Sequence, residues 1–577
     1  MPIQDEFNTT DFQFRSKTDP ALAPAQTAFQ RLDWFLLAII LIAAAFPFIS
    51  ALRHPGTPLE DALMLLRYSE HVAQGHGITW NVGEKPVEGA TDFLYMMAVA
   101  AISKVSGLEV IASARLLISA CWLLLPPVIF VATRRTLGGN RWLCAALALY
   151  MSAGPAHEFI STCYGATVAA LAVAITWWFA NELIYRKISW WASIGMALSA
   201  LTLGLIRPEG NFLAIFILLA VLFKRRRQSG PVVISFLAVF ASLGLGYFLW
   251  RWHYFGHPLP NPFYVKGDGR LYPDGLKHSI ANVIKMLWPA IPIFFLALRK
   301  RQSRSNLLAL MIPLVLFTGI WILLSNENNN VMRFQFPLVP LVLLSLPTLT
   351  WGLSSDLKLP AFPSLSGTVR LALIGAGVSS LLICMAVFQR IYPSVDIVAS
   401  GISYPTYLSQ FASKGYTMAV TEAGQFPFYS KWKAIDTLGL NDAHIAHHGI
   451  SEQYLDEYKP ELILYHADSS FPFDEFQSEL YQTGRPRSKF RDVNAVRVMH
   501  SYALHHNYIL AAAYASINCS FHFFWVRPGT ADTDAIVNYI RTTPYYFIDN
   551  GILSSDFQNN LPKYPCKMDS HSTSTGG

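Results

Sequence analysis

The sequence predicts an α-helical polytopic membrane protein followed by a C-terminal α/β domain. Of its 577 residues, 53% are hydrophobic and only 14% are charged, whereas soluble domains carry about 25% charged residues. Apolar runs that could cross roughly 30 Å of hydrocarbon recur between Trp34 and Phe388. From about residue 391 the composition turns polar and stays so, which indicates a separate domain.

The apolar runs predict about eleven transmembrane helices. Their approximate bounds are 34–52, 113–133, 142–156, 163–184, 190–206, 211–223, 231–250, 282–298, 306–324, 334–350 and 370–389. Basic loops set the orientation, because cytoplasmic loops are rich in Lys and Arg. The basic clusters all lie on the side of the N-terminus; they are Arg134-Arg135, Arg186-Lys187, Lys224–Arg227 and Arg299–Arg301. We therefore expect a cytoplasmic N-terminus in a bacterial cytoplasmic membrane.

One apolar segment, Thr91–Val105, is left out of this count because it is short. Counting it as a span would move Arg134-Arg135 to the outside. We expect an interfacial or re-entrant helix there, as part of the first outer loop. The net charge of +7 then reflects membrane topology and not nucleic-acid binding. The expected parts are a cytoplasmic segment 1–33, a membrane domain 34–390 with first outer loop 53–112, an extracytoplasmic α/β domain 391–566 and a disordered tail 567–577.

Short elements are predicted within the C-terminal domain. Tyr416–Val420, Glu461–Tyr465 and Ala495–Met499 have the composition of strands, and Ser451–Tyr458 that of a helix. The segment Asp436–Asp442, which includes Asn441, is expected to be a loop that follows a strand. Together these elements favour an α/β domain, and because it follows an odd-numbered span it should lie outside the cytoplasm.

The six cysteines show no CxxC pair and no His/Cys ligand spacing, so a structural zinc site is not expected. The four that fall in or beside spans are predicted to be packing residues; they are Cys121, Cys144, Cys163 and Cys384. Cys519 and Cys566 lie in the outer C-terminal region, where either a disulfide or two free thiols is open.

The segment Thr57–Asp92 follows the first apolar run and is charged and punctuated by glycines, as in a structured outer loop. Its start matches a capping box, in which Thr57 is the N-cap and Glu60 returns its carboxylate to the Thr57 amide. The helix is expected to run to Gln74 and to end at Gly75.

The neighbouring acid, Asp61, has no such capping role. At helical spacing it shares a mostly apolar face with Leu65, Tyr68 and Val72. A carboxylate on that face is either paired or functional. Asp61 is therefore the first candidate for a catalytic acid or base, and Glu60 the second.

Polar groups also collect at the outer ends of later spans. They are His157-Glu158, Arg207–Asn211, Asn261–Lys266, Glu327–Asn330 and Arg333–Pro337. Charges near the hydrocarbon boundary are costly and are usually functional or paired. Arg207 and Arg333 depart from the positive-inside pattern, and an outside arginine between apolar spans suits a phosphate. The alternative is an ion pair, Arg207 with Glu209 or Arg333 with Glu327. Lys266 is either a third phosphate ligand or an interfacial anchor.

One acid and several bases on the same side of a membrane domain indicate a type of reaction. The donor would be a sugar on a polyprenyl phosphate, with the phosphate as leaving group and the arginines stabilising its growing charge. The acid would accept the proton of an attacking hydroxyl. The chain has no Walker motif and no GxGxxG, so no nucleotide is required, and we expect no cofactor or metal.

A family resemblance supports this hypothesis. Motifs in the first outer loop are Glu60-Asp61-Ala62, Arg67-Tyr68, Gly75–Gly77, Asn81–Glu84 and Val87–Thr91. Three more follow in the chain: Arg207–Gly210, Arg333–Pro337 and Ile435–Asp442. In this order they resemble motifs of the GT-C glycosyltransferases, most closely the AftB-like terminal arabinofuranosyltransferases of mycobacterial cell-wall assembly. The resemblance covers roughly residues 34–445.

The resemblance implies an integral-membrane enzyme with an outward-facing site and a polyprenyl-phosphate sugar donor. It implies that Asp61 is the catalytic base. Many members carry a Gly-x-Glu-Thr motif after the second outer loop, where this chain has Tyr164-Gly165-Ala166-Thr167, without the acid. The residues expected to bind substrate are Arg67, His157, Glu158, Glu209, Tyr264, Asp436, Asn441 and Asp442. For the last three, building a turn is the alternative role.

The sequence therefore predicts a glycosyltransferase, either hexosyl- or pentosyltransferase, that acts on a cell-envelope glycan, lipid or protein. A pentofuranose is one option for the sugar. One alternative is a transporter or flippase of lipid-linked sugars, which would need polar residues in mid-span and broken helices. Another is an assembly or sensor protein whose working part is the C-terminal domain. The expected partners are the lipid-linked donor, the acceptor and membrane lipid, with no nucleic acid.

Overall fold

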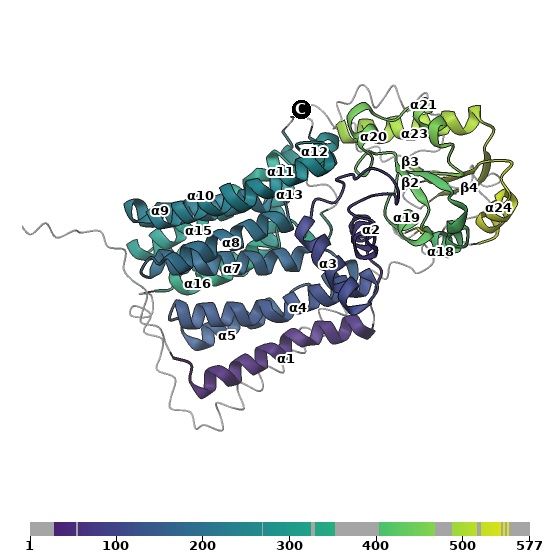
Figure 1. The fold of residues 1–577 in the computed structure, drawn as a ribbon. Coiled ribbons are helices and arrows are strands. Elements are labelled where there is room, and N and C mark those ends of the chain that lie inside the picture. Colours follow the sequence, from purple (N-terminus) through teal and green to yellow (C-terminus); the bar gives the residue numbers. More distant parts are fainter. Residues whose placement is uncertain are drawn as a thin grey trace, which may run out of the picture.

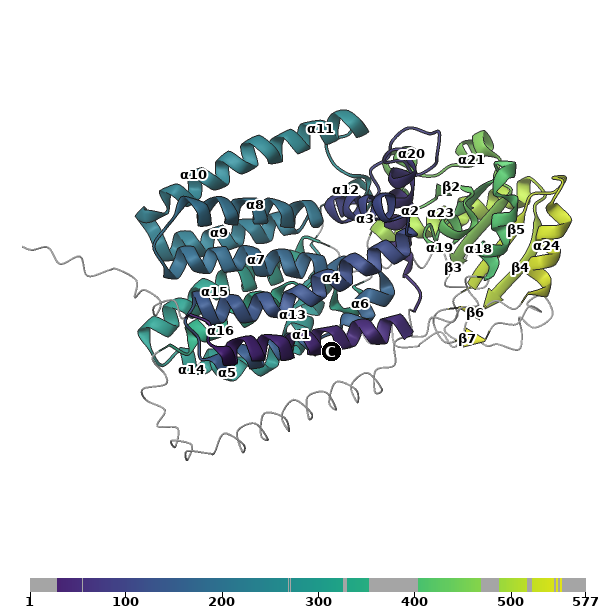
Figure 2. The same cartoon turned by 60° about the horizontal axis from the view of Figure 1, so that its bottom comes forward.

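The computed structural model describes residues 28–53, 56–267, 269, 271–324, 329–351, 403–467, 487–515, 521–543, 546–547 and 551–552. These residues form a bundle of long helices and a separate α/β domain (Figure 1). Helices α2 (Glu60–Gln74) and α3 (Phe93–Ser106) lie between the two parts in both ribbon views (Figures 1 and 2). The segment between α1 and α4, which the sequence predicts to be the first outer loop, therefore forms the junction between the bundle and the α/β domain.

The bundle is that of a multi-pass membrane protein. Among the described residues, six helical stretches are long and apolar enough to cross a membrane: Arg31–Ile49, Val110–Thr136, Ala166–Tyr185, Gly210–Phe255, Pro273–Ala297 and Arg301–Ile322. The bundle helices are α1 (Arg31–Arg53), α4 (Val110–Val131), α5 (Arg141–Ser152), α6 (Ala156–Thr162), α7 (Ala166–Tyr185), α8 (Trp190–Ile206), α9 (Gly210–Arg225), α10 (Gly230–Val239), α11 (Leu245–Phe255), α13 (Pro273–Leu287), α14 (Ile291–Ala297), α15 (Arg301–Gly319) and α16 (Leu338–Leu349).

Ten of the predicted spans coincide with these helices, and the eleventh, 370–389, lies outside the described residues. The predicted span 142–156 ends early, because α5 stops at Ser152 and Pro155 precedes a separate short helix, α6. Proline cannot donate the backbone hydrogen bond that a continuing helix needs. Cys121, Cys144 and Cys163 are buried free thiols, as predicted. The other three cysteines lie outside the described residues.

Helix α3 has 14 residues, so it is about 21 Å long and too short to cross the hydrocarbon. It packs against α2, α4 and α8 at one end of the bundle. This length agrees with the prediction that Thr91–Val105 is not a span; that the segment lies outside the cytoplasm stays a prediction.

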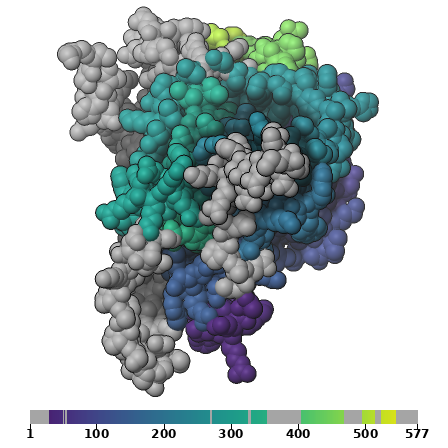
Figure 3. All heavy atoms as spheres, turned by 90° about the vertical axis from the view of Figure 1, so that its left-hand side faces the viewer, coloured from purple at the N-terminus to yellow at the C-terminus, as the bar shows by residue number. Residues whose placement is uncertain are grey.

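The basic clusters gather at the opposite end of the bundle, beside the start of α1. Arg134 Nε lies 3.0 Å from Asp33 Oδ1, and Arg186 Nε donates to the Thr136 carbonyl at 2.7 Å. Figure 3 views this end, with purple atoms of the N-terminal part at the bottom and blue and teal atoms above them. The prediction that these clusters share one side with α1's start is confirmed. That this side is cytoplasmic stays a prediction.

The α/β domain contains a five-stranded sheet in the order β2-β1-β3-β5-β4. Strands β1, β2 and β3 are parallel, and β5 runs antiparallel to both β3 and β4. The strands are β1 (Thr417–Val420), β2 (Lys433–Asp436), β3 (Leu462–Ala467), β4 (Ile509–Ala515) and β5 (Phe521–Val526). Strands β6 (Tyr546–Phe547) and β7 (Gly551–Ile552) pair antiparallel in a second, two-stranded sheet.

Helices cover both faces of the sheet. One face packs against α18 (Ser403–Leu408), α19 (Gln425–Ser430) and α24 (Thr533–Thr542). The other packs against α20 (Ala443–His448), α21 (Glu452–Tyr458) and α23 (Arg487–His505). Alternate residues of β3 supply the two cores, Leu462 and Leu464 on the first face and Ile463 and Tyr465 on the second.

The predicted strands at Tyr416–Val420 and Glu461–Tyr465 are confirmed as β1 and β3, and Ser451 caps α21 through the Tyr454 amide, as its predicted helix requires. The predicted strand Ala495–Met499 is wrong, because it lies inside α23. Its apolar residues continue to Tyr502 and Ala503 on one buried helical face. That spacing is helical, but a five-residue window is too short to show it.

The first outer loop shares a hydrophobic core with the α/β domain. Tyr68 and Trp80 are buried in the same cluster as Phe426 and Trp432. The buried guanidinium of Arg67 joins the two parts: it donates to the carbonyls of Trp80 (2.9 Å) and Trp432 (2.8 Å), to Asn81 Oδ1 (3.2 Å) and to the Pro427 carbonyl. These bonds fix α2 against the α/β domain.

Replacing Arg67 with Met should lower the free energy of unfolding of the detergent-solubilised protein by several kcal/mol. The reason is that each buried carbonyl left unpaired costs about 1–3 kcal/mol. Thermal unfolding followed by tryptophan fluorescence measures the change. The control is Lys431→Ala, which removes the exposed ion pair with Glu70 across the same junction and should cost less than about 1 kcal/mol. Equal stability of the two variants would contradict this role of Arg67.

Candidate active site

A cavity of about 460 Å³ lies at the junction of the bundle and the α/β domain. Its wall comes from α2, from the ends of several bundle helices, and from the loop after β2. Its ionisable and polar lining residues are Asp61, Tyr68, Asp92, Tyr95, Tyr164, Arg207, Glu209, Lys266, Arg333 and Asn441. Six of the predicted site residues therefore line one cavity: Asp61, Arg207, Glu209, Lys266, Arg333 and Asn441.

Asp61 projects from the first turn of α2 into this cavity. The amide groups that a helix start leaves unpaired favour an acidic side chain there. Its Oδ2 accepts a hydrogen bond from Arg333 Nη2 at 2.6 Å. The Asp61 side chain remains 29% exposed and that of Arg333 only 8%, so the carboxylate keeps an open side toward the cavity. The ion pair sets its direction.

Arg333 is held between aromatic rings. Its guanidinium carbon lies 3.9 Å from the centre of the Tyr164 ring and 5.0 Å from that of Phe334, as in cation–π contacts. The Nε atom of Arg333 is buried and has no hydrogen-bond acceptor among the described residues. An unpaired buried donor on a cation is costly, so this site favours an anionic ligand that would accept from it.

Arg207 follows the last residue of α8 and forms the ion pair that the sequence left open as an alternative. Its Nε lies 2.6 Å from Glu209 Oε1, and its Nη1 lies 3.8 Å from Asp92 Oδ2. Arg207 also stacks on the Phe334 ring, 5.1 Å from its centre. Arg207 and Arg333 therefore approach the same aromatic side chain, one paired with Glu209 and the other with Asp61.

Asp92 is a cavity residue that the sequence analysis did not select. Burial raises the pKa of its carboxyl above the ordinary value, and the charge of Arg207 partly offsets that rise. The sequence could have indicated it, since Asp92 directly follows Val87–Thr91, a motif that resembles one of the GT-C enzymes. Tyr164 was also missed as a site residue, although it opens the motif that departs from the family pattern.

The cavity holds three acids and three bases. The acids are Asp61, Asp92 and Glu209, and the bases are Arg207, Lys266 and Arg333. Lys266 ends the short helix α12 (Asn261–Lys266). Balanced opposite charges in one cavity suit a ligand with an anionic group beside neutral hydroxyls, since the bases can contact the anion and the acids the hydroxyls.

The side of the cavity toward the α/β domain is fixed by a hydrogen-bonded chain. Tyr68 donates its hydroxyl to Asn441 Oδ1 at 3.1 Å, and Asn441 Nδ2 donates to Asp436 Oδ2 at 2.8 Å. Gly89 lies against Tyr68 and Asn441, where a Cβ atom would collide with both side chains. Asp436 is buried and also accepts from the Leu438 and Asn441 amides, so it builds this wall without reaching the cavity.

Glu60 does not form the predicted capping box. Leu59 is the N-cap of α2, and no side chain caps the helix start. The Glu60 carboxylate instead accepts from the amides of Gly424 and Gln425, the latter at 3.0 Å. Burial first, and then the charge of Glu422, raise the pKa of Glu60 to about 8. The sequence could not show this, since its partners lie in another domain. Glu60 does not line the cavity.

Several predicted substrate-binding residues lie outside the cavity lining. They are Arg67, His157, Glu158, Tyr264, Asp436 and Asp442. Arg67 is fully engaged at the domain junction, and Tyr264 packs on His447, with 4.4 Å between ring centres. Asp442 caps α20 by accepting from the Ile445 amide at 2.9 Å. For Asp436 and Asp442 the turn-building alternative is the one that fits the structure.

Comparison with known proteins places the fold. A sequence family described as "Domain of unknown function (DUF8728)" matches residues 398–533, within the α/β domain. No curated protein is similar in sequence. The structure is similar to that of ArnT from Cupriavidus metallidurans bound to undecaprenyl phosphate, with a TM-score of 0.53 and 15% identity over 79% of this chain and 97% of that chain.

Two further structures are similar. ArnT from the same organism in the apo state gives a TM-score of 0.52 at 15% identity, over 79% of this chain and 96% of that one. The arabinofuranosyltransferase AftD from Mycobacteria gives 0.44 at 15% identity, over 78% of this chain and 38% of that one. ArnT and AftD are GT-C glycosyltransferases. The likeness to ArnT concerns the fold, and the chain has the GT-C fold that its first-loop motifs predict.

Proposed function

We propose that the chain is a membrane glycosyltransferase that moves a sugar from a polyprenyl-phosphate donor to a hydroxyl group of an acceptor. The observation that carries the proposal is the junction cavity, in which the Asp61–Arg333 pair lies beside Arg207 and Lys266. The undecaprenyl phosphate bound to ArnT, which shares the fold, supports a lipid phosphate as the anionic ligand. The sugar is a hexose or a pentose, and a pentofuranose is the one that the family resemblance favours.

The donor phosphate would lie against Arg333, whose Nε lacks an acceptor among the described residues, and near Arg207 and Lys266. An acceptor hydroxyl attacks the anomeric carbon of the sugar. The bond between that carbon and the phosphate oxygen breaks, and the phosphate leaves with the electron pair. The guanidinium groups stabilise the charge that grows on the leaving oxygen.

Asp61 would act as the general base that takes the proton of the attacking hydroxyl. Its carboxylate is partly exposed in the cavity and is oriented by Arg333, which also contacts the phosphate in this proposal. One arginine would thereby place the base and the leaving group in a fixed relation, and such orientation lowers the barrier to reaction. Asp92 and Glu209 would hold Arg207 in place from the other side.

The acceptor is a glycan, lipid or protein of the cell envelope, and it would enter beside Asn441 and Tyr68. The membrane is the bacterial cytoplasmic membrane, with the α/β domain outside. The charged groups of the cavity lie together at one end of the bundle. A carrier needs polar groups along its path through the membrane, so this arrangement favours a transferase over a flippase.

Replacing Asp61 with Asn should reduce sugar transfer by about 10²- to 10⁴-fold, because the amide keeps the shape of the carboxylate but cannot accept the proton. Transfer is measured in membranes supplied with lipid-linked donors, by mass spectrometry of the envelope glycans. The matched control is Glu70→Gln, an isosteric change on the same helix at the exposed pair with Lys431, and it should transfer normally. Unchanged transfer by a well-folded Asp61→Asn variant would rule out this base.

Replacing Arg333 with Gln should lower kcat/KM for the lipid-linked donor by about tenfold to a hundredfold, because hydrogen bonds to charged groups contribute about 1.5–3 kcal/mol. Arg333→Lys keeps the charge but loses the planar fork, so its donor kinetics should fall between those of the wild type and Arg333→Gln. Steady-state kinetics with varied donor concentration measure both. A donor kcat/KM equal to that of the wild type in Arg333→Gln would argue against phosphate binding here.

A further inference from the structure

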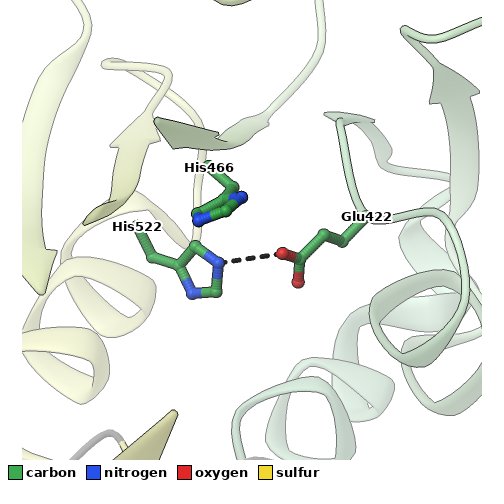
Figure 4. Close-up of side chains that lie close together, drawn as sticks. All are labelled: Glu422, His466 and His522. Atoms are coloured by element: carbon green, nitrogen blue, oxygen red, sulfur yellow. Dashed lines mark hydrogen bonds and ion pairs between the residues drawn. The ribbon is translucent and has the colours of Figure 1, made fainter. Parts of the chain in front are cut away.

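Three potential metal ligands from distant parts of the chain meet at one end of the sheet in the α/β domain. They are Glu422, His466 and His522, drawn in Figure 4. Their ligand atoms all lie within 4.8 Å of one another. Donors that each lie about 2 Å from one metal ion are at most about 4 Å apart, so a small side-chain rotation would close the set. The junction cavity does not include these residues.

The sheet topology explains why the three side chains meet. His466 on β3 and His522 on β5 are directly opposite in the antiparallel register, and opposite residues project from the same face. Glu422 follows the end of β1, the parallel neighbour of β3. The intervening Thr421 accepts a hydrogen bond from the His466 amide at 3.0 Å through Oγ1. The backbone therefore holds all three residues at the same end of the sheet.

The cluster has the chemistry of a metal site. His522 Nε2 lies 2.9 Å from Glu422 Oε1, and the His522 side chain is only 2% exposed. An ion pair would need only these two groups, yet the His466 ring also points to them, with 5.0 Å between the two histidine ring centres. Two imidazoles and one carboxylate form a set that binds zinc and related divalent transition metals, with a further position open.

We propose that Glu422, His466 and His522 bind one divalent transition-metal ion, with zinc as the expected metal. The amides of Gly424 and Gln425, just after Glu422, bind the Glu60 carboxylate at the start of α2. A Cβ atom on Gly424 would collide with Glu60, so the two segments pack closely. The metal would hold this loop in place and, through Glu60, position the helix turn that carries Asp61. The binding itself does not depend on the proposed transferase activity.

Metal analysis of the full-length protein in detergent tests the proposal. After treatment with a chelator and addition of Zn²⁺, inductively coupled plasma mass spectrometry should find one ion per chain. Co²⁺ added in place of zinc should give the visible absorption bands of a protein-bound ion. The test variants are His466→Asn and Glu422→Gln, chosen because both side chains are less buried than His522. The control is His505→Asn, an exposed histidine of the same domain that pairs with Glu452.

In both test variants the affinity for Zn²⁺ and Co²⁺ should fall by more than about 100-fold, because loss of an outer-shell partner alone costs roughly 10- to 100-fold. The control should bind both ions as the wild type does. A wild type that binds no more metal than His466→Asn would overturn the proposal, and so would an equal loss in the control. The two proposals can fail separately. If Asp61→Asn binds metal normally but no form of the protein, wild type included, transfers sugar, the result counts against the proposed function alone.

Discussion

The docking of α2 on the α/β domain is the interaction on which the rest of the structure depends. The buried Arg67 guanidinium joins the Trp80 carbonyl of the first loop to the Pro427 and Trp432 carbonyls of the α/β domain. Glu60 adds a second connection about two turns earlier on α2, through the Gly424 and Gln425 amides. With these contacts made, the next residue, Asp61, turns to the cavity and to Arg333. Adjacent acids on one helix thus have separate tasks, one at the domain junction and one in the site.

The cavity combines two kinds of wall, and this explains its charges. The bundle side supplies Arg207, Glu209 and Arg333, where apolar surroundings make each charge costly unless it is paired. Arg207 and Arg333 meet that requirement through Glu209 and Asp61 and through stacking on Phe334. The α/β domain supplies a neutral wall at Asn441. A lipid-linked anion would approach from the first wall and a hydroxyl-bearing acceptor from the second.

Much of this could be predicted from the sequence, and the exceptions have physical causes. The lengths of the apolar runs and the positions of the basic loops predicted the bundle. Arg207 and Arg333, which depart from the positive-inside pattern, predicted part of the site. Glu60 was misassigned because a local capping pattern cannot reveal amide donors that lie in another domain. Ala495–Met499 has the composition of a strand but lies in α23, because a window shorter than two helical turns does not show the helical period. His466 and His522 showed no ligand spacing, since only the antiparallel register of β3 and β5 brings them together.

In the proposed reaction, the junction cavity holds the phosphate of a lipid-linked donor beside the Asp61–Arg333 pair. The most direct measurement is a cryo-electron microscopy structure of the protein in lipid nanodiscs with undecaprenyl phosphate. We expect density for the phosphate within hydrogen-bonding distance of Arg333, with Asp61 open to the space beside it. Phosphate density outside the cavity, in contact with none of Arg207, Lys266 and Arg333, would contradict the proposed site.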